Sequence, residues 1–128
     1  MKKKILIVED HKDLNKFMQM SFMDSYETLS VKHGEEAVSM AVTEVPDLII
    51  MDLVEYEVDS LEAIPLIREN PKTRSIPIIA ITAGLSNTVE EECTRIGCND
   101  FLFKPFTASQ LNSSITKLLN QNGSNGVD

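Results

Sequence analysis

The chain has 128 residues, of which 42% are hydrophobic and 25% are charged. This length fits one domain with a real hydrophobic core, and the ordinary charged share excludes disorder of the whole chain. The net charge of −8 disfavours bare nucleic acid and anionic lipid as partners, because phosphate groups are bound through Lys and Arg. The apolar run near the N-terminus stops at Glu9, too short for a signal peptide, and no run approaches the roughly 20 residues of a membrane span. We therefore expect a cytoplasmic protein that binds neither nucleic acid nor membrane.

Short apolar runs recur along the chain and predict the strands of a parallel sheet. Most of these runs are continuous rather than alternating, which is typical of strands that are buried on both faces. The predicted strands are 5–8, 28–31, 48–51, 76–81 and 101–103.

Between these runs the apolar residues recur with the helical period of about 3.6. The predicted helix faces are Leu14, Phe17, Met18 and Ser21; Ala37, Val38, Ala41 and Val42; Val89, Cys93 and Ile96; and Leu111, Ile115, Leu118 and Leu119. Thr107 and Gln110 form a capping box that opens the last helix, and Gly97 stands where a C-terminal glycine is expected. Pro65 lies inside the expected third helix and predicts a kink or a late start there.

The alternation of strands and helices predicts an α/β domain of five βα units with helices on both faces of the sheet. We expect residues 1–120 to form this domain and residues 121–128, which are rich in Asn, Gly and Ser, to form a disordered tail or a linker. Such a segment leaves open whether the protein stands alone or is a piece of a longer chain. Cys93 and Cys98 have no histidine near them in sequence, so we expect two reduced thiols.

Polar side chains follow four of the predicted strands at their carboxyl ends. Glu9 and Asp10 follow the first strand, Asp52 the third, Thr82 the fourth and Lys104 the fifth. Sites in open α/β sheets form beyond these strand ends. Like-charged carboxylates at about 4 Å repel by about 4 kcal/mol at an effective dielectric constant of 20, so the three acids call for a proton or a hard cation such as Mg2+. A lysine and a hydroxyl beside them suit a phosphoryl group carried on an aspartate.

Together these residues resemble the response-regulator receiver domain of two-component signalling, in its chemotaxis-regulator-like form, over about residues 3–120. The motifs that carry the resemblance are ILIVED at 5–10, PDLIIMDL at 46–53, IIAITA at 78–83 and GCNDFLFKPF at 97–106. The resemblance implies a flavodoxin-like receiver fold, which is a doubly wound five-stranded parallel sheet in the order 2-1-3-4-5 with five helices.

The resemblance also implies a phosphoacceptor site. Asp52 would accept a phosphoryl group from the phosphohistidine of a sensor histidine kinase or a histidine phosphotransfer protein. Mg2+ would be held by Asp10, Asp52 and the Val54 carbonyl, with Glu9 acting through a bound water. The domain would be a phosphorelay switch rather than a dedicated enzyme, with only weak auto-dephosphorylation.

The remaining site residues are implied to bind the phosphoryl group and to report its presence. Lys104 would pair with the phosphoryl group, preceding a cis bond to Pro105, and the Thr82 hydroxyl and Ala83 N–H would donate to its oxygens. Thr82 and Phe101 would form the switch. A downstream protein would then bind the face formed by the fourth helix, the fifth strand and the fifth helix, and the domain would be a monomer or a weak dimer.

The loop after Asp52 departs from the family pattern, which usually continues Leu-x-Met-Pro-x-Met-Asp-Gly. Here residues 53–60 read LVEYEVDS, so the first methionine, the proline and the glycine are replaced. An alternative function is therefore a locked, phosphorylation-independent interaction module with an atypical loop at 55–60. An aspartyl phosphatase is disfavoured because such enzymes resemble Asp-x-Asp, whereas Leu53 and Val54 follow Asp52. A flavin-binding flavodoxin is disfavoured because the loop after the first strand is acidic.

Overall fold

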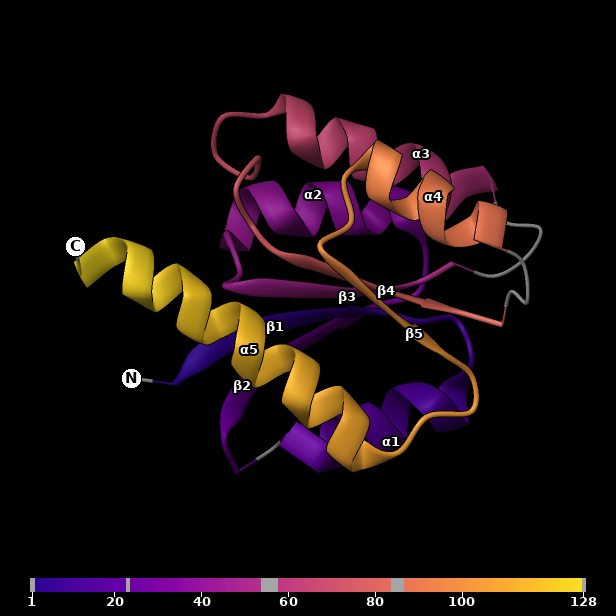
Figure 1. The fold of residues 1–128 in the computed structure, drawn as a ribbon, viewed down its shortest axis with the longest axis vertical. Helices are drawn as coiled ribbons and strands as arrows, with labels where there is room; N and C mark the ends of the chain where they lie inside the picture. The colour runs from indigo at the N-terminus through magenta and orange to yellow at the C-terminus, as the bar shows by residue number, and fades with distance from the viewer. Residues whose placement is uncertain (1, 23, 54–57, 84–86, 128) are drawn as a thin grey trace.

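Five parallel strands form one sheet in the described part of the chain, in the order β2-β1-β3-β4-β5. The structure is a computed structural model that describes the chain apart from residues 1, 23, 54–57, 84–86 and 128, and apart from the side chains of 58–60, 87–90 and 121–127. The strands are β1 (Lys3–Val8), β2 (Tyr26–Val31), β3 (Leu48–Asp52), β4 (Ile78–Thr82) and β5 (Asp100–Phe103). The helices are α1 (Lys12–Phe22), α2 (Gly34–Glu44), α3 (Val58–Glu69), α4 (Asn87–Ile96) and α5 (Ala108–Val127). Figure 1 shows α2, α3 and α4 on one face of the sheet and α1 and α5 on the other, which confirms the predicted fold class.

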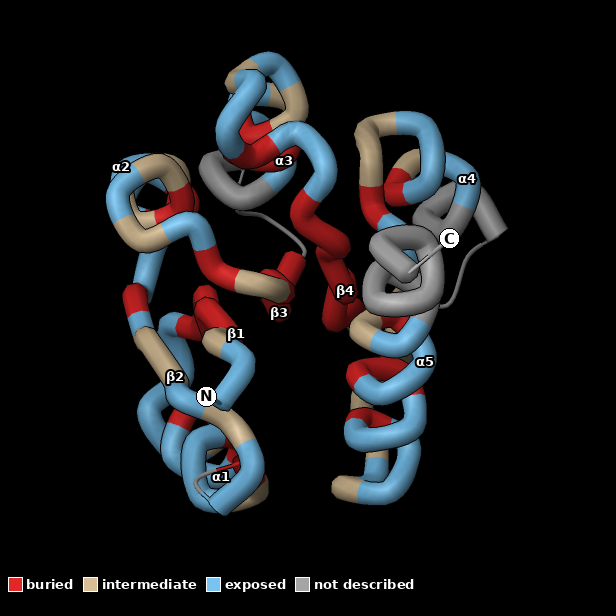
Figure 2. Tube along the Cα trace, turned by 90° about the vertical axis from the view of Figure 1, so that its left-hand side faces the viewer, coloured by how far each residue is buried: buried red, intermediate tan, exposed pale blue. Residues whose placement is uncertain are grey.

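The central strands are buried on both faces, as their continuous apolar sequences predict. Every residue of β3 and β4 is buried, whereas most of the edge strand β2 is at least partly exposed (Figure 2). Successive strand residues point to opposite faces. Ile49 and Met51 therefore join the core cluster that includes residues of α2, α3 and α4, while Leu48 and Ile50 join the cluster that includes residues of α1 and α5. The two clusters pack against opposite faces of the sheet and hold the strands in place.

The buried face of α1 differs from the predicted one. The residues of α1 that are buried are Asn15, Met18 and Phe22, whereas Phe17 is 40% exposed. Phe17 instead contacts Phe106, with 6.5 Å between the ring centroids. The prediction placed Phe17 in the core and is wrong at that position, because the hydrogen bonds of Asn15 allow a polar side chain to be buried in the helix instead.

The capping predictions at the ends of two helices are confirmed. The Gln110 N–H donates to Thr107 Oγ1 at 3.0 Å and the Thr107 N–H donates to Gln110 Oε1 at 2.8 Å, which is a complete capping box. At the end of α4, Gly97 has a φ of +119° and the Cys98 N–H donates to the Cys93 carbonyl at 2.9 Å. This is the hydrogen bond of a glycine-terminated helix, in which the left-handed residue turns the chain toward β5.

Two helices differ from expectation in their extent. Helix α3 begins well before Pro65 and continues through it, so the expected late start is wrong. The ring of Pro65 removes one backbone hydrogen bond to the carbonyl of Leu61, and Leu61 is an exposed residue whose carbonyl water can reach. Helix α5 extends to Val127, through the segment in which we expected a tail or linker from residue 121. Gly and Asn cost a helix up to about 1 kcal/mol each relative to Ala, which does not forbid them there.

At the amino ends of β4 and β5 a single guanidinium group holds several segments together. Arg68 on α3 donates to the carbonyls of Gly97, Arg74 and Ile76 at 2.7–3.0 Å. It also donates at 2.8 Å to Asn99 Oδ1, which in turn accepts the N–H of Ile78. The geometry requires close approach, since a Cβ at position 97 would lie 2.9 Å from the Cγ of Arg68. Arg68 therefore fixes the end of the sheet opposite to the predicted site.

The Arg68 contacts lead to a prediction about stability. Arg68→Lys should lower the free energy of unfolding by about 2 kcal/mol, because an ammonium group cannot replace the planar guanidinium fork and leaves carbonyls unpaired. Arg74→Lys is the matched control, since the Arg74 side chain is exposed and only its carbonyl takes part. Urea unfolding of both variants measures the difference, and equal stabilities would contradict the assigned role of Arg68.

Candidate functional site

Glu9 is a buried acid immediately beyond the end of β1. It is 2% exposed, and its N–H donates to the Val31 carbonyl at 3.0 Å. The His11 N–H donates to Glu9 Oε2 at 2.8 Å, and the Asn15 Nδ2 donates to the Glu9 carbonyl at 3.0 Å. Its other carboxyl oxygen, Oε1, is buried and accepts no hydrogen bond. Glu9 is thus held by backbone and side chain while one oxygen is left without a donor.

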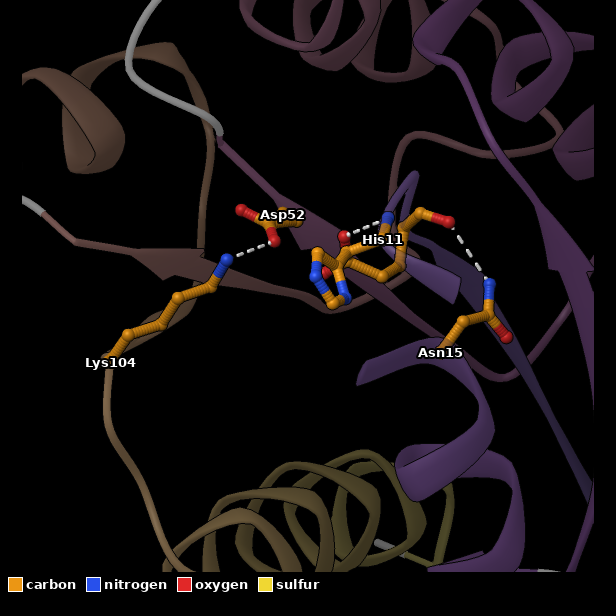
Figure 3. A network of polar contacts seen from close by, with 5 residues as sticks. His11, Asn15, Asp52 and Lys104 are labelled. Atoms are coloured by element: carbon orange, nitrogen blue, oxygen red, sulfur yellow. Dashed lines mark hydrogen bonds and ion pairs between the residues drawn. The ribbon is translucent and has the colours of Figure 1, made fainter. Parts of the chain in front are cut away.

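Asp52 is the last residue of β3 and faces Lys104. The Lys104 Nζ lies 2.6 Å from Asp52 Oδ2, and the side chains point toward each other in Figure 3. Asp52 is 4% exposed, and its Oδ1 is buried without a hydrogen-bond partner. Lys104 is positioned by the backbone, since its N–H donates to the Thr82 carbonyl at 2.9 Å. The sheet therefore brings two side chains that are far apart in sequence, Asp52 and Lys104, into one charged contact.

The two buried carboxyl groups share one nearby cation, and this sets the protonation of Glu9. The pKa of Glu9 is raised from 4.5 to about 8, mainly by burial and further by hydrogen bonding and repulsion with the neighbouring Asp52 carboxyl. The His11 N–H and the charge of Lys104 act in the opposite direction on the same pKa. A protonated Glu9 would donate a hydrogen bond toward Asp52, which would provide partners for the two unpartnered oxygens. A bound cation would provide partners for the same oxygens by coordination.

The donor set of the site fits a hard cation. Glu9 Oε1 and Asp52 Oδ1 are unpartnered carboxyl oxygens, and the exposed Asp10 follows directly in sequence. In the described part of the chain no three His, Cys, Asp or Glu side chains are close enough to hold a metal by themselves. Mg2+ does not need such a cage, because it usually binds one or two carboxylates and keeps several waters.

The other predicted site residues lie at the same edge of the sheet where they can be described. Thr82 ends β4 and is 4% exposed, and Ala83 follows it as an exposed residue. Phe101 lies in β5, is half-buried against the core cluster that includes Cys93, and contacts the Phe103 ring at 5.9 Å. The Lys104–Pro105 bond is cis, as predicted. Val54 and the atypical loop at 55–60 fall at residues that are wholly or partly outside the description.

One polar residue of this region was not predicted from the sequence. Asn15 is buried in α1 and donates to the Glu9 carbonyl (Figure 3), and its Oδ1 accepts from Gln19 and from Ser30. The signal that could have found it is position. A residue in the first turn of a helix that follows a strand end directly can reach back to that strand end, and an Asn on the buried face of a helix needs such a partner.

Comparison with known proteins identifies the family. The sequence matches the response regulator receiver domain over residues 5–116. The chain belongs to this family. It is 32% identical over 120 residues to the polar-differentiation response regulator DivK of Brucella anthropi, covering 93% of this chain and 98% of that protein.

Solved receiver domains have the same fold. The receiver domain of a sensor histidine kinase from Pseudomonas aeruginosa is 30% identical, with a TM-score of 0.85 over 94% of this chain and 99% of that one, and contains a magnesium ion coordinated in its active site cleft. The receiver domain of a signal transduction histidine kinase from Syntrophus aciditrophicus is 30% identical, with a TM-score of 0.84 over 93% and 91% of the two chains.

Membership places the protein in two-component phosphorelay signalling, where receiver domains act as switches rather than as dedicated enzymes. They exchange signals with histidine kinases and downstream proteins. None of the described helices is both long enough and apolar enough to cross a membrane.

The raised pKa of Glu9 predicts how the stability of the metal-free receiver depends on pH. The folded state favours protonated Glu9, so this contribution is fully present below pH 4.5 and is lost as the pH rises through about 8. In EDTA, wild type should lose stability relative to Glu9→Gln over this interval, by at most about 1.4 kcal/mol per pH unit. Urea unfolding at several pH values measures the difference, and parallel curves for the two proteins would contradict the prediction.

Proposed function

We propose that this receiver domain accepts a phosphoryl group on Asp52 from the phosphohistidine of a sensor histidine kinase or a histidine phosphotransfer protein. The observation that carries the proposal is the state of the Asp52 carboxylate. One of its oxygens is paired with Lys104 at 2.6 Å, and the other is buried with no donor. A carboxylate that is desolvated, oriented and only half satisfied is suited to act as a nucleophile.

The magnesium ion that such chemistry needs would be held by Asp10, Asp52 and the Val54 carbonyl, with Glu9 acting through water. When bound, Mg2+ supplies positive charge that offsets the repulsion between the acids and the incoming phosphoryl oxygens. Two unpartnered carboxyl oxygens in a water-poor site support this assignment, since an uncompensated buried charge is costly.

The transfer step itself is a displacement at phosphorus. A bond forms between an Asp52 carboxylate oxygen and phosphorus while the bond from phosphorus to the donor imidazole nitrogen breaks, and the bonding electron pair stays on that nitrogen. Lys104 then pairs with a phosphoryl oxygen in place of Asp52 Oδ2, and the Thr82 hydroxyl and the Ala83 N–H donate to the other oxygens. These donors would place positive charge and N–H and O–H dipoles where negative charge gathers on the phosphoryl oxygens.

Phosphorylation would be read out through Thr82 and Phe101. Thr82 ends β4 beside the proposed phosphoryl position, and Phe101 lies on the neighbouring strand, where its side chain is only half-buried. A shift of both would change the face formed by α4, β5 and α5, to which a downstream protein would bind. Slow hydrolysis of the acyl phosphate resets the switch, and we expect a cytoplasmic monomer or weak dimer.

The proposal predicts one phosphoryl adduct on Asp52. Incubation with Mg2+ and acetyl phosphate should add a single phosphoryl group, because the small donor replaces the kinase while the receiver supplies the acceptor. Intact mass spectrometry measures the adduct. Asp52→Asn and addition of EDTA should each abolish it, and Asp47→Asn is the matched control, since Asp47 only caps the N–H of Lys4 at the start of β1.

A folded wild-type protein that binds Mg2+ but gains no adduct would overturn the proposal. That result would favour the phosphorylation-independent module and would direct attention to the loop at 55–60. An adduct that survives Asp52→Asn would instead move the acceptor to another residue.

The contact between Lys104 and Asp52 predicts opposite effects on two measurable quantities. Lys104→Met should bind Mg2+ at least as tightly as wild type, because the ammonium group that competes for Asp52 is gone. It should accept phosphoryl groups about 10²-fold more slowly, because a charge-stabilising donor is lost. Calorimetric titration with Mg2+ and the rate of adduct formation measure the two effects.

Lys72→Met controls for the loss of one positive charge, since Lys72 is exposed in the turn after α3 and forms no ion pair with the residues that the structure describes. It should leave both quantities close to the wild-type values. A parallel loss of Mg2+ binding and phosphorylation in Lys104→Met would contradict the assigned role, because it would mean that Lys104 supports the acid pocket as a whole.

A further inference from the structure

The Asn15 side chain connects three segments of the receiver at one point. Its Nδ2 donates to the Glu9 carbonyl at 3.0 Å, across the turn that joins β1 to α1. Its Oδ1 accepts from Gln19 Nε2 at 2.6 Å and from Ser30 Oγ at 2.9 Å. Gln19 lies one turn after Asn15 in α1, and Ser30 lies in β2. The orientation of the Asn15 amide is therefore determined by partners on two different elements.

These contacts complete the restraint of Glu9. Its N–H is paired with Val31 in β2, its carbonyl with Asn15, and its Oε2 with the His11 N–H. Among the residues that the structure describes, no donor reaches the remaining polar atom of Glu9, Oε1. Two of these three restraints come from backbone atoms of Val31 and His11, and the third comes from the side chain of Asn15.

Asparagine is well matched to this position, because the position needs a donor and an acceptor on the same short planar group. Aspartate would keep the acceptor and lose the donor, and serine would be too short to reach both sides. Asn15 also lines an open pocket of about 510 Å3 together with Glu9, Gln19 and Ser30. Water from that pocket can hydrate the Glu9 carbonyl if the amide is removed, so a substitution here releases the turn without burying an unpaired carbonyl.

We propose that Asn15 is a positioning residue for the acid pair Glu9–Asp10, which it holds in the arrangement that binds a divalent cation. The inference rests on the proposed function, because Asn15 touches neither the cation nor the phosphoryl group. It acts through the Glu9 carbonyl, in the way that outer partners of metal ligands commonly do. The amide of Asn15 also makes the acid pair sensitive to the relative placement of α1 and β2.

The test compares Asn15→Asp with wild type by calorimetric titration with Mg2+. The variant keeps the acceptor for Gln19 and Ser30, loses the donor to Glu9, and adds a negative charge near the site. Added charge alone would tighten Mg2+ binding, whereas loss of positioning should weaken it about tenfold. Affinity that is unchanged or tighter in Asn15→Asp would overturn the proposal.

Two control variants separate positioning from general destabilisation. Ser30→Ala removes the hydroxyl that donates to Asn15 Oδ1 but keeps the Asn15 amide that donates to Glu9. It should therefore leave the Mg2+ affinity within about threefold of wild type. Ser114→Ala removes the partly buried hydrogen bond from Ser114 on α5 to Asp100 in β5, and should leave the affinity unchanged at a comparable loss of stability. A loss of Mg2+ affinity in Ser114→Ala equal to that in Asn15→Asp would also overturn the proposal.

A measurement in the absence of metal keeps the inference separate from the proposed function. In Asn15→Ala the amide hydrogen of His11, which is bonded to Glu9 Oε2, should exchange faster with solvent while the amides of β4 remain protected. If wild type binds no Mg2+ and gains no phosphoryl group, the proposed function fails, and this exchange pattern still tests the hold of Asn15 on the turn. Unchanged exchange at His11 would refute that hold.

Discussion

Two carboxyl groups are buried beside a single ammonium group, and this charge imbalance dominates the electrostatics of the receiver domain. Glu9 and Asp52 are both nearly inaccessible, yet only Asp52 Oδ2 is paired with a cation. Such an arrangement is unfavourable unless a proton, a metal or a phosphoryl group completes it. Without a cation, burial and the neighbouring Asp52 carboxyl raise the pKa of Glu9, so a proton on Glu9 offsets part of this cost; under the proposed function a cation would replace that proton.

The fold can bear this cost because its stability is generated elsewhere. The central strands carry apolar side chains on both faces, and two separate clusters of buried residues lie above and below them. At the amino ends of β4 and β5 the guanidinium group of Arg68 joins α3 to the chain around Gly97. Apolar burial and the Arg68 contacts hold the strands in register, so the opposite edge is free to carry residues chosen for chemistry rather than for packing.

Much of this arrangement could be predicted from the sequence because it depends on patterns that are local or additive. Continuous apolar runs indicated strands buried on both faces, and the Thr107–Gln110 pair indicated the start of α5. The positions of Asp52, Thr82 and Lys104 at the ends of predicted strands placed them at one edge of the sheet, because the carboxyl ends of parallel strands lie at the same edge. What could not be predicted depends on partners distant in sequence. Periodicity alone places Phe17 in the core, whereas Asn15 is buried because of its contacts with Glu9 and Ser30.

The Glu9 side of the site and the Lys104 side are restrained by contacts with different elements. Glu9 is restrained by contacts with Val31 in β2 and with Asn15 in α1, whereas Lys104 is held at its own N–H by the carbonyl of Thr82, a residue proposed to move. The acid that would help to bind the cation is therefore fixed, and the lysine that would bind the phosphoryl group is attached to the switch. If Asp52 is phosphorylated as proposed, the added charge would therefore act first through Lys104 on Thr82 and β4, and only little on the restrained Glu9 at the end of β1.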